Sequence, residues 1–171
     1  LIVLAAPLAW LFGSALLRDD VFVFRDAAHY YYPLYKYVAD QWAAGRAPLW
    51  NPQENLGQPL LADATSAVLY PGKLVFALPL GYGVNFKLYV IGHVVLAAVT
   101  AFIAARGFAR STGAATICAL SYALCGSVVF QYCNVPFLVS AAWLPLAILA
   151  TERMLTRRSW RWAIGLAATM A

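Results

Sequence analysis

The chain has 171 residues, of which 63% are hydrophobic and 11% are charged, and its formal net charge at pH 7 is +5. A soluble domain is about half apolar and about a quarter charged, so this composition excludes an ordinary soluble domain and predicts a polytopic membrane protein. The basic residues lie mostly in short clusters between apolar runs, which indicates membrane topology and no nucleic-acid partner.

The hydropathy pattern predicts an all-α, polytopic bundle of transmembrane helices in a single domain. The predicted elements, in chain order, are a transmembrane helix (1–17), a polar loop (18–66), an interfacial helix (67–82), three transmembrane helices (86–105, 113–130 and 137–153) and the start of another (162–171). Both ends fall in apolar runs, so we expect the chain to be the N-terminal fragment of a longer protein.

The loop over 18–66 contains six of the seven acidic residues: Asp19, Asp20, Asp26, Asp40, Glu54 and Asp63. Ionisable groups are costly in hydrocarbon and collect where water or a substrate meets them. A loop of this length on a membrane protein is usually functional. The sequence therefore predicts that the chemistry of the protein lies in this long loop, which carries interfacial helices and an irregular turn region over 44–59.

The basic turns predict the orientation of the chain. The turn with Arg106 and Arg110 and the turn beginning at Arg153 are separated by two predicted spans, so they lie on one side, which basic residues mark as cytoplasmic. The loop 18–66 is then extracytoplasmic if the segment 67–82 does not cross the membrane, and cytoplasmic if it does. Its prolines and Lys73 favour the first alternative.

The local pattern around Asp26 leaves two interpretations open. An amphipathic helix is predicted from Phe24 to Trp42, with a bend at Pro33, and Asp26 stands where a residue capping its N-terminus would be. The same position suits a carboxylate that takes a proton from a substrate hydroxyl. The three cysteines show no Cys/His spacing typical of a zinc site, and no metal ligand set is predicted.

A set of loop and helix residues resembles the YfhO-like family of bacterial membrane proteins. The residues that carry the resemblance are Asp26, Tyr31, Pro33, Gly45, Pro48-Leu49-Trp50, Gly57 and Tyr70-Pro71, followed downstream by Ser121 to Gly126, Asn134, Leu144-Pro145-Leu146 and Glu152-Arg153. The chain departs from the family at Tyr30, where the family tends to carry Gln. The family is similar to the GT-C class of integral-membrane glycosyltransferases.

The resemblance implies an enzyme that moves a sugar from a polyprenyl-phosphate donor to an extracytoplasmic glycan or protein acceptor, in the bacterial cytoplasmic membrane. Asp26 is the expected catalytic carboxylate, as a base or as support for a divalent metal, and Glu54 or Asp63 would assist it. Cationic side chains suit the lipid phosphate, and aromatic or amide side chains suit the sugar. The expected substrate contacts are Arg25, His29, Tyr30, Tyr31, Arg46, Trp50 and Asn51.

Two other functions remain open from the sequence. A transporter or flippase for a lipid-linked substrate would carry charged groups near the middle of its spans. The predicted span 86–105 holds Lys87 near its end and His93, and the span 113–130 holds no charged residue. A non-catalytic membrane assembly protein would instead use the loop aromatics to dock a partner.

Overall fold

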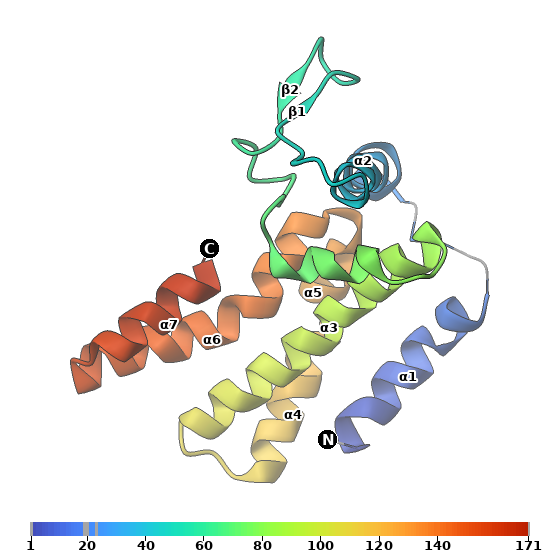
Figure 1. Ribbon diagram of the computed structural model, residues 1–171. Helices are drawn as coiled ribbons and strands as arrows, with labels where there is room; N and C mark the ends of the chain where they lie inside the picture. The colour runs from blue at the N-terminus through green and yellow to red at the C-terminus, as the bar shows by residue number, and fades with distance from the viewer. Residues whose placement is uncertain (1, 19–20, 23, 171) are drawn as a thin grey trace.

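The computed structural model describes residues 2–18, 21–22 and 24–170, and it is mostly helical, as expected for an all-α protein. Its helices are α1 (Ile2–Leu17), η1 (Ala27–Tyr31), α2 (Tyr32–Ala43), η2 (Pro71–Ala77), α3 (Tyr82–Gly107), α4 (Thr112–Ala123), α5 (Gly126–Val129), η3 (Phe130–Cys133), α6 (Val135–Arg157) and α7 (Trp160–Met170). Two short strands, β1 (Trp50–Asn51) and β2 (Gln58–Pro59), form a hairpin (Figure 1). The loop residues Asp19 and Asp20 lie outside the described residues.

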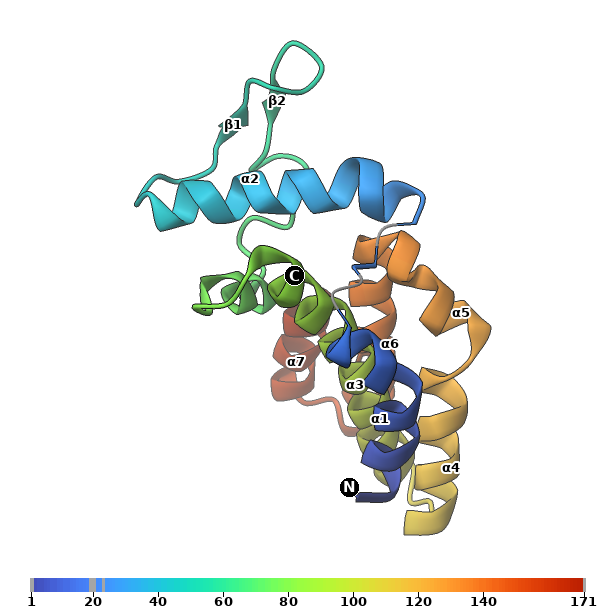
Figure 2. The same cartoon turned by 90° about the vertical axis from the view of Figure 1, so that its right-hand side faces the viewer.

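Two described helices, α3 and α6, are long and apolar enough to cross a membrane. A third crossing results if α4 and the segment α5–η3, which are bent by 48° relative to each other, count as one span. Helix α3 is the centre of the bundle, with α1, α4 and α6 packed around it (Figures 1 and 2). The buried residues of α3 include Ala97, Ala98, Ala101 and Ala104, and such small side chains let neighbouring helices approach closely.

The polar segment leaves and re-enters the bundle at the same end. The ammonium group of Lys87, near the start of α3, donates hydrogen bonds to the carbonyl oxygens of Ala15 and Arg18 at the end of α1. Helix α2 lies across this end of the bundle, and the hairpin projects beyond it (Figure 2). At the far end of α3, Arg153 of α6 donates a hydrogen bond to the carbonyl oxygen of Gly107, so the two arginine-containing turns meet there.

The predicted helix over 113–130 is interrupted in the structure. Helix α4 ends at Ala123, and Cys125 has an extended backbone with φ −66° and ψ 150° before α5 begins at Gly126. Glycine has a low helix propensity, which weakens the helix at this point. The break turns the chain into η3 and brings Asn134 beside the polar segment, where its side chain accepts a hydrogen bond from Tyr31.

The predicted interfacial helix over 67–82 is a shorter 3-10 helix, η2. It begins at Pro71, a residue whose missing N–H costs nothing in a first helical turn. It ends before Leu78, whose extended backbone (ψ 141°) is the conformation that a following proline, Pro79, favours. The hairpin was not predicted, because Pro48 to Pro59 carries turn residues and no alternating apolar pattern. Its two strands pair antiparallel, with Trp50 opposite Pro59 and Asn51 opposite Gln58.

The aromatic residues of the polar segment form the junction between that segment and α3. Tyr35 of α2 is fully buried and packs edge-on against Tyr89 of α3, and Tyr32 packs in the same way against Phe86. Aromatic pairs in this geometry stabilise a structure beyond the area that they bury. The tyrosines after Asp26 are therefore mainly the apolar contact between α2 and the membrane helices.

Candidate functional site

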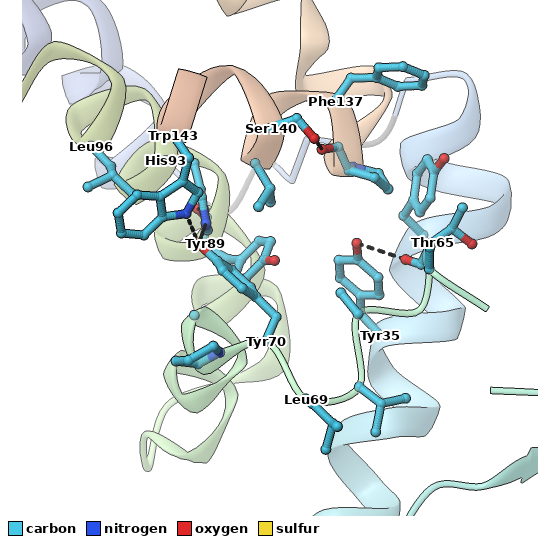
Figure 3. A pocket seen from close by; sticks show the side chains of 18 of the residues that line it. Tyr35, Thr65, Leu69, Tyr70, Tyr89, His93, Leu96, Phe137, Ser140 and Trp143 are labelled. Atoms are coloured by element: carbon cyan, nitrogen blue, oxygen red, sulfur yellow. Dashed lines mark hydrogen bonds between the residues drawn. The ribbon is translucent and has the colours of Figure 1, made fainter. Parts of the chain in front are cut away.

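A cavity of about 1300 Å³ lies between the segment 61–75, the first half of α3, the first half of α6 and the end of α7. Figure 3 shows side chains from α2, α3 and α6 around this space. The polar residues that line it are Tyr31, Tyr35, Asp63, Thr65, Tyr70, Tyr89, His93, Ser140, Trp143 and Thr169. Leu69, Leu96, Phe137 and Val139 are among its apolar residues. A mostly apolar cavity with a few converging polar groups is the usual form of a small-molecule site.

A chain of hydrogen bonds crosses one wall of the cavity. The hydroxyl group of Tyr70 lies 2.8 Å from Nε2 of His93, and Trp143 donates from Nε1 to the same hydroxyl oxygen at 2.9 Å. The other ring nitrogen of His93, Nδ1, lies 2.6 Å from the carbonyl oxygen of Tyr89. Burial raises the pKa of the Tyr70 hydroxyl, and the hydrogen bond from Trp143 acts in the opposite direction. Tyr70 therefore stays protonated near neutral pH and connects α3 to α6 (Figure 3).

Asp63 is the carboxylate that lines the cavity. Its Oδ1 accepts hydrogen bonds from the backbone N–H and the hydroxyl of Thr65, at 2.9 and 2.8 Å, and its Oδ2 accepts one from Gln58 at 3.3 Å. The hydroxyl of Tyr30 lies 3.4 Å from that of Thr65, and the hydroxyl of Tyr35 donates to the Thr65 carbonyl oxygen. The turn at 63–66 thus holds a negative charge in a defined position beside the aromatic residues of α2.

Asp26 lies outside the cavity and is exposed to solvent. It stands at the N-cap position of η1, as predicted, but its backbone is already helical (φ −65°, ψ −24°) and its side chain makes no capping hydrogen bond. It lies close to Tyr31, which does line the cavity. Burial and then the carboxylate of Asp26 raise the pKa of the Tyr31 hydroxyl, which donates to Asn134 at 2.8 Å. The carboxylate of Asp63 raises the pKa of Tyr31 as well, by a smaller amount.

The cationic residues predicted to contact a phosphate are distributed over both ends of α2. Arg25 and His29 are exposed beside Asp26, and the backbone of Arg25 is left-handed, with φ 53°. Arg46 follows the other end of α2, where it donates to the side-chain oxygen of Gln41 at 3.1 Å. The helical segment between Asp26 and Arg46 is about 25 Å long, so these two side chains do not bind one small ligand together.

The hairpin holds three further predicted site residues, all outside the cavity lining. Asn51 is buried and donates to the carboxylate of Glu54 at 3.3 Å, while its own side-chain oxygen accepts from the backbone of Gln53. The ring of Trp50 covers Gly57, where φ is +115° and where a Cβ atom would overlap that ring. The hairpin projects away from the bundle (Figure 1). The contacts of these residues lie within the hairpin, so the residues stabilise its turn.

Lys73 is a buried cation behind the cavity wall. Its ammonium nitrogen lies 2.6 Å from the centre of the Tyr35 ring and 5.6 Å from that of Tyr89, and it has no hydrogen-bond partner among the described residues. The side chain is only 8% exposed, and burial lowers the pKa of Lys73 well below its usual value. In the sequence, Lys73 indicated that the segment 67–82 does not cross the membrane, and the structure places its side chain among tyrosines.

The described residues do not fit a metal beside Asp26. No group of three or more His, Cys, Asp or Glu side chains within the described part of the chain is arranged to hold an ion. The divalent metal that the resemblance allows beside Asp26 therefore has no donor set among these residues, and no step of the chemistry below depends on one.

Sequence reasoning did not select Tyr70, His93 or Trp143 as site residues. Tyr70 was considered as part of the family resemblance, and His93 only as a sign of transport. The available signal was His93 itself, because an ionisable residue within an apolar span is a candidate functional residue by default. Tyr70 lies 23 residues before His93, and Trp143 lies 73 residues after Tyr70, so no local pattern reveals that the three residues meet.

The fold and the cavity define an integral membrane protein with a mostly apolar cavity, which contains a few converging polar groups, at one end of its helices. The sequence matches the family model described as "Bacterial membrane protein YfhO" over residues 11–170. The chain therefore belongs to the YfhO family of bacterial membrane proteins, and the resemblance predicted from its motifs is confirmed. No match is found among the curated proteins or among the solved structures.

Proposed function

We propose that the protein is a membrane glycosyltransferase of the GT-C type, which transfers a sugar from a polyprenyl-phosphate donor to an extracytoplasmic acceptor. The observation that carries the proposal is the cavity between the polar segment and α3 and α6, with Asp63 in its wall. Membership of the YfhO family supports it. The cavity volume of about 1300 Å³ leaves room for a sugar together with part of a prenyl chain.

The lining of the cavity suits both parts of a lipid-linked sugar. Leu69, Leu96 and Val139 provide apolar surface for prenyl units. The rings of Tyr70 and Trp143 provide flat apolar faces with hydrogen-bonding edges, which is the surface that binds sugar rings. The donor would enter between the membrane helices and place its sugar beside the turn at 63–66.

Asp63 is the carboxylate best placed to act on the sugar. Glycosyl transfer passes through a transition state with positive charge at the anomeric carbon, and a fixed carboxylate beside that carbon stabilises the charge. The hydrogen bonds from Thr65 and Gln58 hold the Asp63 carboxylate in place, so little reorganisation is needed during the reaction. Asp26, the base predicted from the sequence, remains a candidate at the rim beside Tyr31.

The arrangement of charge supports an extracytoplasmic site. The turns that contain Arg106 and Arg153 meet at one end of α3, and the polar segment lies at the other end. Short basic turns favour the cytoplasmic side of a bacterial inner membrane, which would place the cavity at the outer face. Sugar transfer from a polyprenyl phosphate to an external acceptor requires that orientation.

The test is sugar transfer by the full-length protein in membranes, followed as loss of radiolabelled sugar from a polyprenyl-phosphate pool. We expect Asp63→Asn to lower the rate by about 100-fold or more, because a fixed charge at the reacting centre is lost. The matched control is Asp40→Asn, since Asp40 is exposed and pairs only with Lys36 on the same helix.

The outcomes separate the proposal from its rivals. Loss of transfer in Asp63→Asn with normal membrane insertion supports it. Full activity in Asp63→Asn together with loss in Asp26→Asn returns the catalytic role to Asp26. If the wild-type protein transfers no sugar from any donor tested, the glycosyltransferase proposal fails. Transport then becomes the better proposal, because His93 faces the cavity from within a span.

A further inference from the structure

The hydrogen bonds around His93 determine where its proton lies. The carbonyl oxygen of Tyr89 only accepts, so Nδ1 of His93, 2.6 Å away, carries a hydrogen and donates it. In the neutral ring Nε2 is then the free lone pair, and the hydroxyl of Tyr70, 2.8 Å away, donates to it. The indole N–H of Trp143 only donates, so it occupies one lone pair of the Tyr70 oxygen.

This arrangement leaves the Tyr70 hydroxyl with one hydrogen-bonding position that a ligand can use. Its one proton is directed at His93 and one of its lone pairs is taken by Trp143, so the other lone pair accepts a hydrogen bond. All three side chains line the cavity, and Figure 3 shows them together on one wall. The ligand group that fits this position is a hydrogen-bond donor, and for a sugar acceptor that group is a hydroxyl.

We propose that Tyr70 and His93 together form the general base that removes the proton from the acceptor hydroxyl. This inference rests on the proposed glycosyltransferase function. The acceptor O–H transfers its proton to the oxygen of Tyr70 while Tyr70 transfers its own proton to Nε2 of His93. The acceptor oxygen bonds to the anomeric carbon, and the bond from that carbon to the phosphate oxygen breaks with its electron pair leaving on the phosphate.

The surroundings of His93 support this assignment. After the transfer the ring is an imidazolium, and its Nδ1–H remains hydrogen-bonded to the Tyr89 carbonyl oxygen, which stabilises the positive charge. The titratable groups around the ring are Tyr70, Tyr89 and Lys73 of η2, and the residue that α6 contributes to the hydrogen-bond chain, Trp143, does not titrate. Burial lowers the pKa of Lys73 and so favours its neutral amine. A neutral amine does not repel the imidazolium of His93.

His93 and Asp63 have different roles in the proposed reaction. Both oxygens of Asp63 already accept hydrogen bonds, from Thr65 and from Gln58. A carboxylate held in this way is a fixed charge for the sugar, while the acceptor proton passes through Tyr70 to Nε2 of His93. The reaction then has a negative charge at the sugar and a separate base at the acceptor, as general acid–base catalysis requires.

The experiment measures kcat and KM for sugar transfer by the full-length protein between pH 5 and pH 9. In the wild-type protein we expect kcat to fall on the acid side, because a protonated His93 cannot accept a proton. Tyr70→Phe and His93→Gln should each lower kcat by about 100-fold or more, with little change in KM for the donor. His93→Gln should also lose the acid-side fall. Tyr37→Phe is the matched control, because its hydroxyl bonds only to the Trp50 carbonyl oxygen, outside the cavity.

A second measurement separates a base from a structural residue. If Tyr70→Phe fails to insert, His93→Gln decides the question by its own pH profile. Restoration of transfer in His93→Ala by added imidazole supports a proton-accepting role, since a purely structural role is not restored by a free base. Wild-type kcat and an unchanged acid-side fall in inserted His93→Gln would overturn the proposal and leave the proposed function standing. Absence of transfer in the wild-type protein would overturn both.

Discussion

The ammonium group of Lys87 donates to the backbone carbonyl oxygens of Ala15 and Arg18, at 3.1 and 2.6 Å. The last carbonyl groups of a helix have no partner within it, and they carry the negative end of the helix dipole. Lys87 is 4% exposed and satisfies two of these groups at the end of α1. A single side chain of α3 thus joins the helix before the polar segment to the helix after it.

Lys87→Met should lower the free energy of unfolding by about 2 kcal/mol, because two charge-assisted hydrogen bonds are lost and two carbonyl groups at the end of α1 lose their partner. Denaturant unfolding in detergent measures the change. Lys36→Met is the control, since Lys36 pairs with Asp40 on an exposed helix face and such pairs contribute little. Equal stability of the two variants would show that Lys87 does not hold α1 in place.

Gly72→Ala should lower sugar transfer by about 100-fold, because a methyl group at this position displaces the ring of Tyr70. A Cβ atom on Gly72 would lie 3.0 Å from Cδ1 of that ring and closer still to Cε1. Gly92→Ala is the matched control, because Gly92 also lines the cavity but a Cβ atom there meets no atom within 4 Å. Similar transfer rates in both variants would contradict a required position for the Tyr70 ring.

Lys73 should make stability depend on pH. Its pKa in the folded protein is lowered by burial, so between that value and about 10.4, the usual pKa of lysine, the amine is neutral when folded and protonated when unfolded. Unfolding then takes up a proton, and the free energy of unfolding rises with pH across this window. Unfolding of the wild type and of Lys73→Met at several pH values measures the effect as their difference.

Lys73→Met should be at least as stable as the wild type at neutral pH and should lack this rise, because it removes an unpaired buried amine. Lys36→Met again serves as the control and should keep the rise. A wild-type protein whose stability changes with pH in parallel with that of Lys73→Met would show that Lys73 is hydrated when the protein is folded.

The polar segment and the basic turns should be accessible from opposite sides of the membrane. Leu56 at the hairpin tip and Ala109 between α3 and α4 are both exposed. In a protein whose three native cysteines are replaced, Leu56→Cys should react with an impermeant thiol reagent added outside intact cells. Ala109→Cys should react only after the membrane is opened. The reverse pattern would place the cavity at the cytoplasmic face and contradict transfer to an external acceptor.

The sequence was sufficient for the class, the family and much of the helical framework. Apolar runs long enough to span a bilayer produce a strong local signal, so α3 and α6 were predicted to within a few residues of their observed ends. The break at Cys125 and the hairpin of Trp50 and Pro59 were not predicted. Both depend on single backbone conformations and on pairing between short segments, for which hydropathy has no signal.

The candidate site was predicted only in part from the sequence. The sequence alone predicted that the carboxylates and aromatic residues of the polar segment carry the chemistry, because charge is excluded from hydrocarbon. Only the tertiary structure decided that Asp63 lines the cavity while Glu54 lies in the hairpin turn. Only the tertiary structure joined Tyr70 to His93 and Trp143, since contacts between residues far apart in the chain follow from helix packing and not from spacing.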